Sequence, residues 1–134
     1  MAERVSSLLR RSVGHLEAEV PDSYRLILDK LGPLEVDLDV DGERFTLRGG
    51  NRLEVSDGVA SAAGARIATS RSTIRDVLDA RVGLSDAVDA DSLRVFGSLD
   101  DILRAHDTLL AYVHAAVRAP SQPGLLAALR EGCA

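Results

Sequence analysis

The chain has 134 residues, 46% of them hydrophobic and 28% charged, which is typical of one globular domain and excludes a disordered chain. Its formal net charge of -5 argues against nucleic acid or an anionic membrane as the main partner. No run reaches the roughly 18 apolar residues that span a membrane. The N-terminal residues lack a signal-peptide pattern, so we expect a cytoplasmic protein.

Two helices are predicted in the first 31 residues. Apolar residues recur at helical spacing and predict an amphipathic helix over residues 2–18. A second, short helix is expected to begin at Pro21, because proline favours the first helical position, and to end at Gly32-Pro33.

A β-hairpin is predicted over residues 34–48. Apolar and acidic side chains alternate from residue 34 to 40, and Asp41-Gly42 is a strong two-residue turn signal. A turn there makes apolar side chains meet on one face and charged or polar side chains meet on the other, in five pairs: Leu38 with Phe45, Val36 with Leu47, Asp39 with Arg44, Asp37 with Thr46 and Glu35 with Arg48. A slip of one residue would break both sets, so this register is expected.

Shorter elements follow the hairpin. We expect strands over residues 53–55, 65–69 and 93–96, and a helical turn over residues 84–88. Ser70 or Ser72 should cap a helix between the second and third of these strands. Arg71 and Arg75 are expected on the solvated side of that helix.

The most informative segment is a long helix predicted from Ser98 to Val117. Ser98 is a suitable N-cap, and Asp101 three residues later completes a capping box. Large apolar residues recur along the helix and share one face, at ~100° per residue: Leu99, Ile102, Leu103, Leu109, Leu110, Val113 and Val117. We expect this face to pack on the sheet through Ile102, His106, Leu110 and Val113.

His106 lies in the middle of that apolar face. One interpretation is a core histidine bonded to a backbone carbonyl or a carboxylate, since a buried polar group needs a partner. A second is a group that contacts a ligand or acts as an acid or base. A third is that the helix is rotated and His106 faces solvent. These three alternatives stay open at the level of sequence.

The last residues form a separate unit in this reading. Residues 1–118 are predicted to be the domain, and residues 119–134 a linker with a short helix over residues 125–130 that could dock on a partner or a second copy. The single cysteine, Cys133, excludes an internal disulfide. We find no metal-ligand spacing, phosphate-binding loop or nucleophile motif, so we expect no metal and no cofactor.

The order of elements predicts an α+β domain, and one stretch resembles a known family. The residues 66–103, R-I-A-T-S-R-S-T-I-R-D-V-L-D-A-R-V-G-L-S-D-A-V-D-A-D-S-L-R-V-F-G-S-L-D-D-I-L, resemble the sterol carrier protein 2 family. Leu93, Val95 and Gly97 match its strand-and-turn pattern, and Leu78 matches the end of the preceding helix. The resemblance covers residues 34–117 and points to a standalone bacterial member.

The resemblance implies a five-stranded mixed sheet covered by helices on one side, with a sterol, fatty acid or acyl-CoA bound between the layers. We therefore predict an apolar pocket for a lipid-like, sterol-like or polyketide-like molecule, lined by Val36, Leu38, Phe45, Leu47, Leu103, His106, Leu110 and Val113. One alternative is a biosynthetic enzyme of cyclase or isomerase type that uses His106 as acid or base. Another is a structural or regulatory subunit. Fold alone does not separate these hypotheses.

Overall fold

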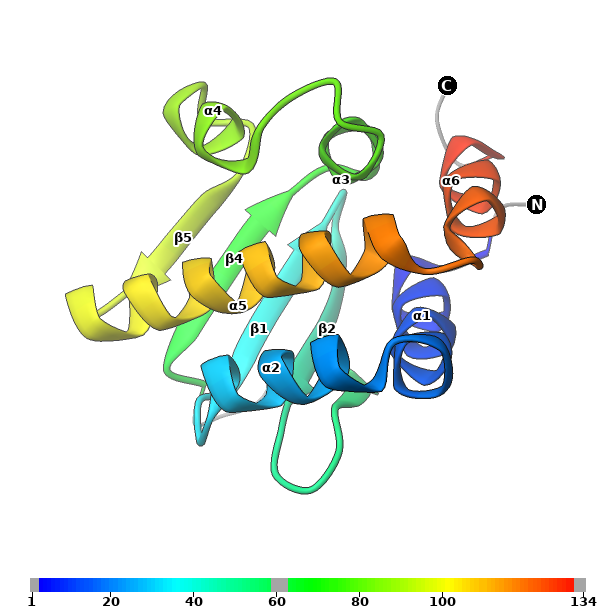
Figure 1. Ribbon diagram of the computed structural model, residues 1–134. Helices are drawn as coiled ribbons and strands as arrows, with labels where there is room; N and C mark the ends of the chain where they lie inside the picture. Colours follow the sequence, from blue (N-terminus) through cyan, green and yellow to red (C-terminus); the bar gives the residue numbers. More distant parts are fainter. Residues whose placement is uncertain (1–2, 59–62, 132–134) are drawn as a thin grey trace.

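The computed structural model describes residues 3–58 and 63–131 of the chain (Figure 1). Within these residues it contains six helices and one sheet of five strands, as the fold class predicted. The helices are α1 Val5–Glu19, α2 Pro21–Leu31, α3 Arg71–Leu78, α4 Leu84–Asp89, α5 Leu99–Arg118 and α6 Gln122–Glu131; the strands are β1 Val36–Val40, β2 Glu43–Arg48, β3 Glu54–Asp57, β4 Ala65–Thr69 and β5 Arg94–Gly97.

The sheet is mixed and has the order β3-β2-β1-β4-β5. The central pair β1 and β4 is parallel, and the other neighbouring strands are antiparallel. The β1–β2 register confirms the predicted hairpin, because Leu38 pairs with Phe45 and Asp39 with Arg44. The turn residues Asp41 and Gly42 both have positive φ, of 54° and 88°, as a tight hairpin turn requires.

The helices cover one face of this sheet. Figure 1 shows α2 and α5 crossing that face side by side, with α1 and α6 at one end of the layer and α3 and α4 at the upper edge of the sheet. The opposite face carries charged side chains that pair with one another: the Arg48 guanidinium lies 3.7 Å from Glu35 and 3.4 Å from Glu54. This amphipathic sheet puts the core between the strands and the helices.

Helix α5 begins as the sequence predicts. The hydroxyl of Ser98 accepts a hydrogen bond from the backbone N–H of Asp101 at 3.2 Å, so the N-cap is confirmed. Helix α3 is capped by Ser70 rather than Ser72, because the Ser70 hydroxyl accepts from the N–H of Thr73. Both helices therefore start at a serine that satisfies an otherwise free N–H group.

The buried face of α5 was predicted wrongly. The fully buried residues of α5 are small, and they are Ala105, Thr108, Ala111, Ala115 and Ala116, while Leu109, Tyr112 and Val113 are half-buried against the core. Leu103 and Leu110, predicted to be buried, are 55% and 37% exposed. His106, Ile102 and Val113 are half-buried at the border. The helix is rotated because small side chains let it pack closely against α2, and that close approach decides which face is buried.

The C-terminal segment is packed against the rest of the fold. Helix α6 begins at Gln122, three residues before the predicted start, and contacts α1, α3 and α5. Leu129 of α6 is 2% exposed and joins a small apolar cluster with Leu8, Leu78 and Ala116. The boundary at residue 118 stays a prediction, but residues 122–131 form part of the same body.

Candidate ligand cavity

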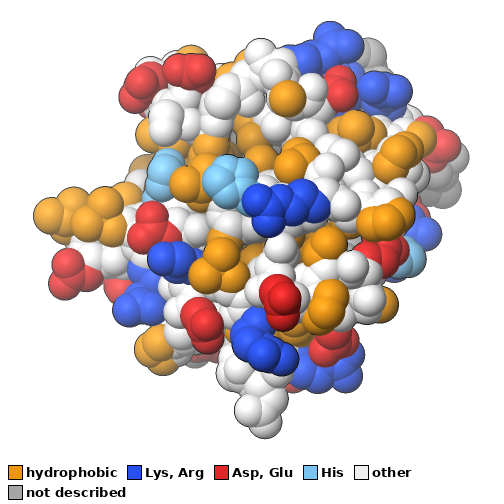
Figure 2. Space-filling view, viewed as in Figure 1, with side chains coloured by type: hydrophobic (Ala, Val, Ile, Leu, Met, Phe, Trp, Pro, Cys, Tyr) orange, Lys and Arg blue, Asp and Glu red, His pale blue; other side chains and the backbone are white. Residues whose placement is uncertain are grey.

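An apolar cavity of about 110 Å³ lies between the sheet and the helices. Strands and all six described helices contribute side chains, so the wall of this partly open cavity is built by elements from both ends of the chain. On the face shown in Figure 2, hydrophobic side chains gather along and above α5, beside this part of the core. Its lining side chains include Val5, Leu8, Leu9, Val13, Leu38, Phe45, Leu47, Ile67, Ile74, Val77, Leu109, Val113, Leu125 and Leu129.

The three hydroxyl groups in this lining already have partners. Thr108 donates to the carbonyl of Arg104 at 2.7 Å, and Thr69 donates to the carbonyl of Ser92 at 2.9 Å. The Tyr112 hydroxyl lies 2.6 Å from the hydroxyl of Ser12. Burial raises the pKa of Tyr112 to about 12, although the bond to Ser12 opposes the rise, so the phenol is neutral at physiological pH. The cavity wall therefore presents hydrocarbon to a ligand.

Half of the eight residues predicted to line the pocket do so. Leu38, Phe45 and Leu47 from the hairpin and Val113 from α5 contribute to the wall. Val36 is only 2% exposed but packs in the core away from the cavity lining.

The predicted contributions of three α5 residues to the wall were wrong. Leu103 and Leu110 are exposed, and His106 lies outside the lining. The cause is the rotation of α5, which brings Thr108, Leu109, Tyr112 and Val113 to the cavity instead. The half-buried side chain of His106 makes no hydrogen bond or ion pair to another described residue, so it is not a partnered core histidine there. Its acid–base role stays a prediction, and it has no place among the cavity-lining side chains.

The contributions of α1 and α6 to the cavity wall were not predicted from the sequence. The α1 signal was present in the sequence, because Val5, Leu8, Leu9 and Val13 belong to its predicted apolar stripe. Leu125 and Leu129 of α6 lie beyond a segment rich in proline and glycine, which had suggested a detached unit. Nothing in the local sequence shows that this helix folds back over the cavity.

Arg71 holds α6 in that position. Its guanidinium donates to the carbonyls of Leu129 and Ala128 at 2.9 and 2.8 Å, and to the carbonyl of Glu3 at 2.8 Å. The side chain is buried, so its predicted place on a solvated face was wrong. The last carbonyls of a helix lack partners within the helix, and a cation there also complements the helix dipole. One arginine thus joins α3, α6 and Glu3, which lies two residues before α1.

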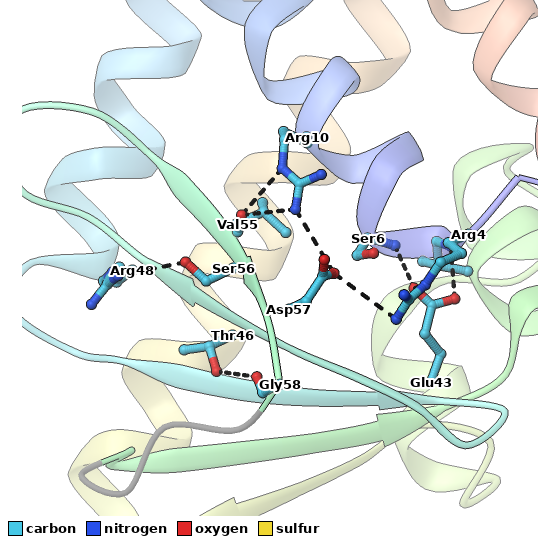
Figure 3. Close-up of polar contacts among 11 residues, drawn as sticks. Arg4, Ser6, Arg10, Glu43, Thr46, Arg48, Val55, Ser56, Asp57 and Gly58 are labelled. Carbon is cyan, nitrogen blue, oxygen red and sulfur yellow. Dashed lines mark hydrogen bonds and ion pairs between the residues drawn. The ribbon is translucent and has the colours of Figure 1, made fainter.

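Glu43 holds the start of α1 on the sheet (Figure 3). Its carboxylate accepts hydrogen bonds from the N–H groups of Val5 and Ser6 at 2.9 and 2.8 Å. Burial raises the pKa of Glu43, but the two backbone bonds and the charge of Arg4 outweigh burial, so the pKa is lowered from its usual 4.5. The carboxylate therefore acts as an N-cap supplied by β2.

A second contact fixes α1 against the edge of the sheet. Arg10 donates to the carbonyl of Val55 through Nε and Nη2 at 3.2 and 3.1 Å (Figure 3). It also lies 3.8 Å from the carboxylate of Asp57. These bonds occupy a carbonyl of the edge strand β3 and hold the apolar side of α1 over the cavity.

Two further classes of site find no support in the described parts of the chain. Residues 3–58 and 63–131 contain no group of three or more His, Cys, Asp or Glu side chains that could hold a metal ion. None of the helices in these ranges is long and apolar enough to cross a membrane. Cys133 lies outside the described residues.

The chain is a small α+β domain of a class in which an apolar cavity lies between an open mixed sheet and a layer of helices on one of its faces. Solved structures show that the particular fold is that of sterol carrier protein 2. A ubiquinone synthesis protein, UbiJ-SCP2, superposes with a TM-score of 0.57 at 15% identity, over 78% of this chain and 89% of that chain.

Two further solved structures have the same fold. The sterol carrier protein 2 like 2 of Aedes aegypti gives a TM-score of 0.55 at 14% identity, over 77% of this chain and 94% of its own. The sterol carrier protein 2 of Yarrowia lipolytica, in its apo form, gives 0.53 at 13% identity, over 81% and 88%. No family model matches the chain, and no curated protein matches it in sequence. At these identities the likeness concerns the fold.

Proposed function

We propose that this chain binds the apolar part of a small lipid-like molecule in the cavity between the sheet and the helices. The observation that carries the proposal is the cavity wall, in which hydrocarbon side chains dominate and the hydroxyls are already bonded. Such a wall favours an apolar ligand, because a polar group placed there would lose its hydrogen bonds to water without replacement. Solved structures of the same fold whose names include sterol carrier proteins support the same class of ligand.

The size of the cavity favours a slender ligand. Its volume of about 110 Å³ is below the roughly 300–1,000 Å³ of pockets that bury drug-sized molecules. A single alkyl or prenyl chain suits this space better than a rigid fused-ring system. The polar end of such a ligand would remain outside, since the wall offers it no free partner.

The test is a titration of the purified chain with a fluorescent fatty acid, followed by displacement with unlabelled palmitate. We expect saturable binding at micromolar concentration and full displacement. Val113→Phe fills part of the cavity and should weaken binding at least tenfold while the melting temperature stays close to that of the native chain. Leu103→Phe is the matched control: it adds the same ring to the exposed side of the same helix and should leave affinity unchanged.

Two results would contradict the proposal. One is that the native chain binds no fluorescent fatty acid and releases no apolar compound on solvent extraction. The other is that Val113→Phe and Leu103→Phe, both folded, bind the probe as the native chain does. Palmitate and cholesterol used as separate competitors distinguish an alkyl chain from a ring system, and stronger displacement by cholesterol would overturn the argument from cavity size.

A further inference from the structure

The outer side of α5 carries a ridge of large apolar side chains with no partner in the fold. Six large apolar side chains are exposed in the described part of the chain, and four of them lie on this one helix. They are Leu99, Leu103, Leu110 and Val117, at 72%, 55%, 37% and 44% exposure. Contiguous exposed apolar surface of this kind marks an interaction site more often than scattered single residues do.

The spacing along the ridge is that of a helix-pairing seam. Counting the half-buried His106 and Val113, the ridge positions are 99, 103, 106, 110, 113 and 117, so the steps alternate between four and three residues. This heptad pattern keeps one stripe facing a neighbouring helix. Any helix with one apolar face has this alternation, so the choice of a second helix over a lipid surface rests on the self-complementarity and the charge pattern of the ridge.

From this spacing we propose that the α5 ridge is the contact between two copies of this chain, with the two α5 helices antiparallel. We place the twofold axis perpendicular to α5 at the level of residue 108. Each ridge residue of one copy then faces a ridge residue of the other: Leu99 faces Val117, Leu103 faces Val113, and His106 faces Leu110. Because every ridge residue meets another ridge residue in the second copy, the ridge is self-complementary, as the shared interface of a twofold dimer must be.

The charges beside the ridge favour the same arrangement. On the flank facing α2, the N-terminal half of α5 carries Asp100 and Asp107 beside Arg104, whose guanidinium donates to the Lys30 carbonyl of α2 at 3.2 Å. The C-terminal half carries His114 and Arg118. Antiparallel pairing brings the acidic half of one copy next to the basic half of the other and also opposes the two helix dipoles. A parallel pair would place like halves together, and the acidic half would be repelled by an anionic membrane.

One contact in this arrangement is unfavourable. Asp107 lies close to the twofold axis and faces Asp107 of the second copy. Removal of this repulsion should tighten the dimer, so Asp107→Asn gives a gain-of-association test that general damage to the fold would not mimic. Val113 contributes both to the cavity wall and to the edge of the ridge, but the other five ridge positions lie outside the cavity lining, so the inference does not depend on a ligand in the cavity.

Sedimentation velocity of the full chain at increasing concentration tests the proposal. We expect the mass to rise from 14.3 kDa toward about twice that value. Leu103→Glu should weaken the dimer at least roughly 30-fold, since it places a carboxylate in an apolar layer, and Asp107→Asn should tighten it roughly fivefold. Phe96→Glu is the matched control: Phe96 is also exposed, but it lies on the open face of the sheet under Arg66.

Orientation is tested by cysteine pairs in a Cys133→Ser background. Leu99→Cys and Val117→Cys chains should each form few disulfides alone and form them readily when mixed. Cross-linking of each variant with itself would overturn the antiparallel arrangement. A native chain that stays monomeric at high concentration, or a dimer that Phe96→Glu weakens as much as Leu103→Glu, would overturn the dimer. Monomers that bind phosphatidylcholine vesicles through Leu103 would assign the ridge to a lipid surface instead.

Discussion

Helices α1, α2, α5 and α6 form a layer whose inner side faces the sheet and whose outer side faces solvent. The two sides differ in the size and the contacts of their side chains. On the inner side α5 presents alanines and a threonine, and Ala115 is fully buried. Polar anchors fix the neighbouring helices there, with Arg71 at the end of α6 and Glu43 at the start of α1. On the outer side the same helix α5 presents leucines to solvent.

This difference shows that the size of an apolar side chain does not decide which face of a helix is buried. Small residues let α5 approach α2 closely, and close packing gives many weak contacts per residue. The large residues are left to the surface, where burying them would require another molecule. The inner side can therefore be tested through stability, and the outer side through association.

The largest effect should come from Arg71. Arg71→Ala removes three charge-assisted hydrogen bonds and leaves buried carbonyls without partners, so we expect a loss of about 3–4 kcal/mol of unfolding free energy. Urea unfolding measures it. Arg75→Ala, one turn later on α3, is the control, because the Arg75 guanidinium pairs with the neighbouring Asp76 at 3.2 Å and bonds no helix-end carbonyl among the described residues. A similar small loss in both variants would show that α6 is not held by Arg71.

Overfilling the inner side of α5 should have the next largest effect. Ala115 is 0% exposed and is not among the residues that line the cavity, so Ala115→Leu adds three carbons to a buried position outside the cavity wall. We expect a loss of about 2–3 kcal/mol, measured by the same unfolding curves. If the variant is as stable as the native chain, α5 does not pack closely on α2. The inner side of α5 would then be no more tightly packed than its outer side.

A smaller, pH-dependent effect is expected at Glu43. Its pKa is lowered in the folded state, so its stabilising contribution is complete above the usual value of 4.5 and is lost as the pH falls through the folded pKa. Glu43→Gln should lower the unfolding free energy by about 1 kcal/mol at pH 7. Near pH 3 the difference between Glu43→Gln and the native chain should shrink. A difference that grows on acidification would contradict the N-cap role.

Much of the fold could be predicted from the sequence where two independent patterns agreed. In the β1–β2 hairpin, apolar alternation and charge pairing selected the same register, and the ion pairs Asp39–Arg44 and Glu35–Arg48 are present at 3.4 and 3.7 Å. Ser98 and Ser70 likewise combined a cap residue with the start of an apolar period. Local rules of this kind need no knowledge of distant contacts.

The cavity was only partly predictable, because its walls depend on long-range contacts. The hairpin residues Leu38, Phe45 and Leu47 were identified since one face of a strand must be buried. Of the four predicted α5 residues, Val113 alone lies in the wall, because spacing showed an apolar stripe but gave no reason to choose alanines for the core. Arg71 was missed as well, since its partners are carbonyls of residues 57 and 58 positions away in the sequence.

The smallest effect on stability should separate the two sides most clearly. Leu110→Ala removes a large apolar side chain from the outer side, where water already contacts it. Alanine also has the higher helix propensity, so at low micromolar concentration we expect a change below about 0.5 kcal/mol. The same substitution on the inner side, Leu16→Ala at a residue only 1% exposed, should cost about 2–5 kcal/mol. At high concentration Leu110→Ala should weaken association of the two copies, whereas it should leave fatty acid affinity unchanged because Leu110 is not part of the cavity wall. A loss above 2 kcal/mol in the dilute monomer would mean that Leu110 is buried and that α5 is rotated toward the face its sequence spacing predicts.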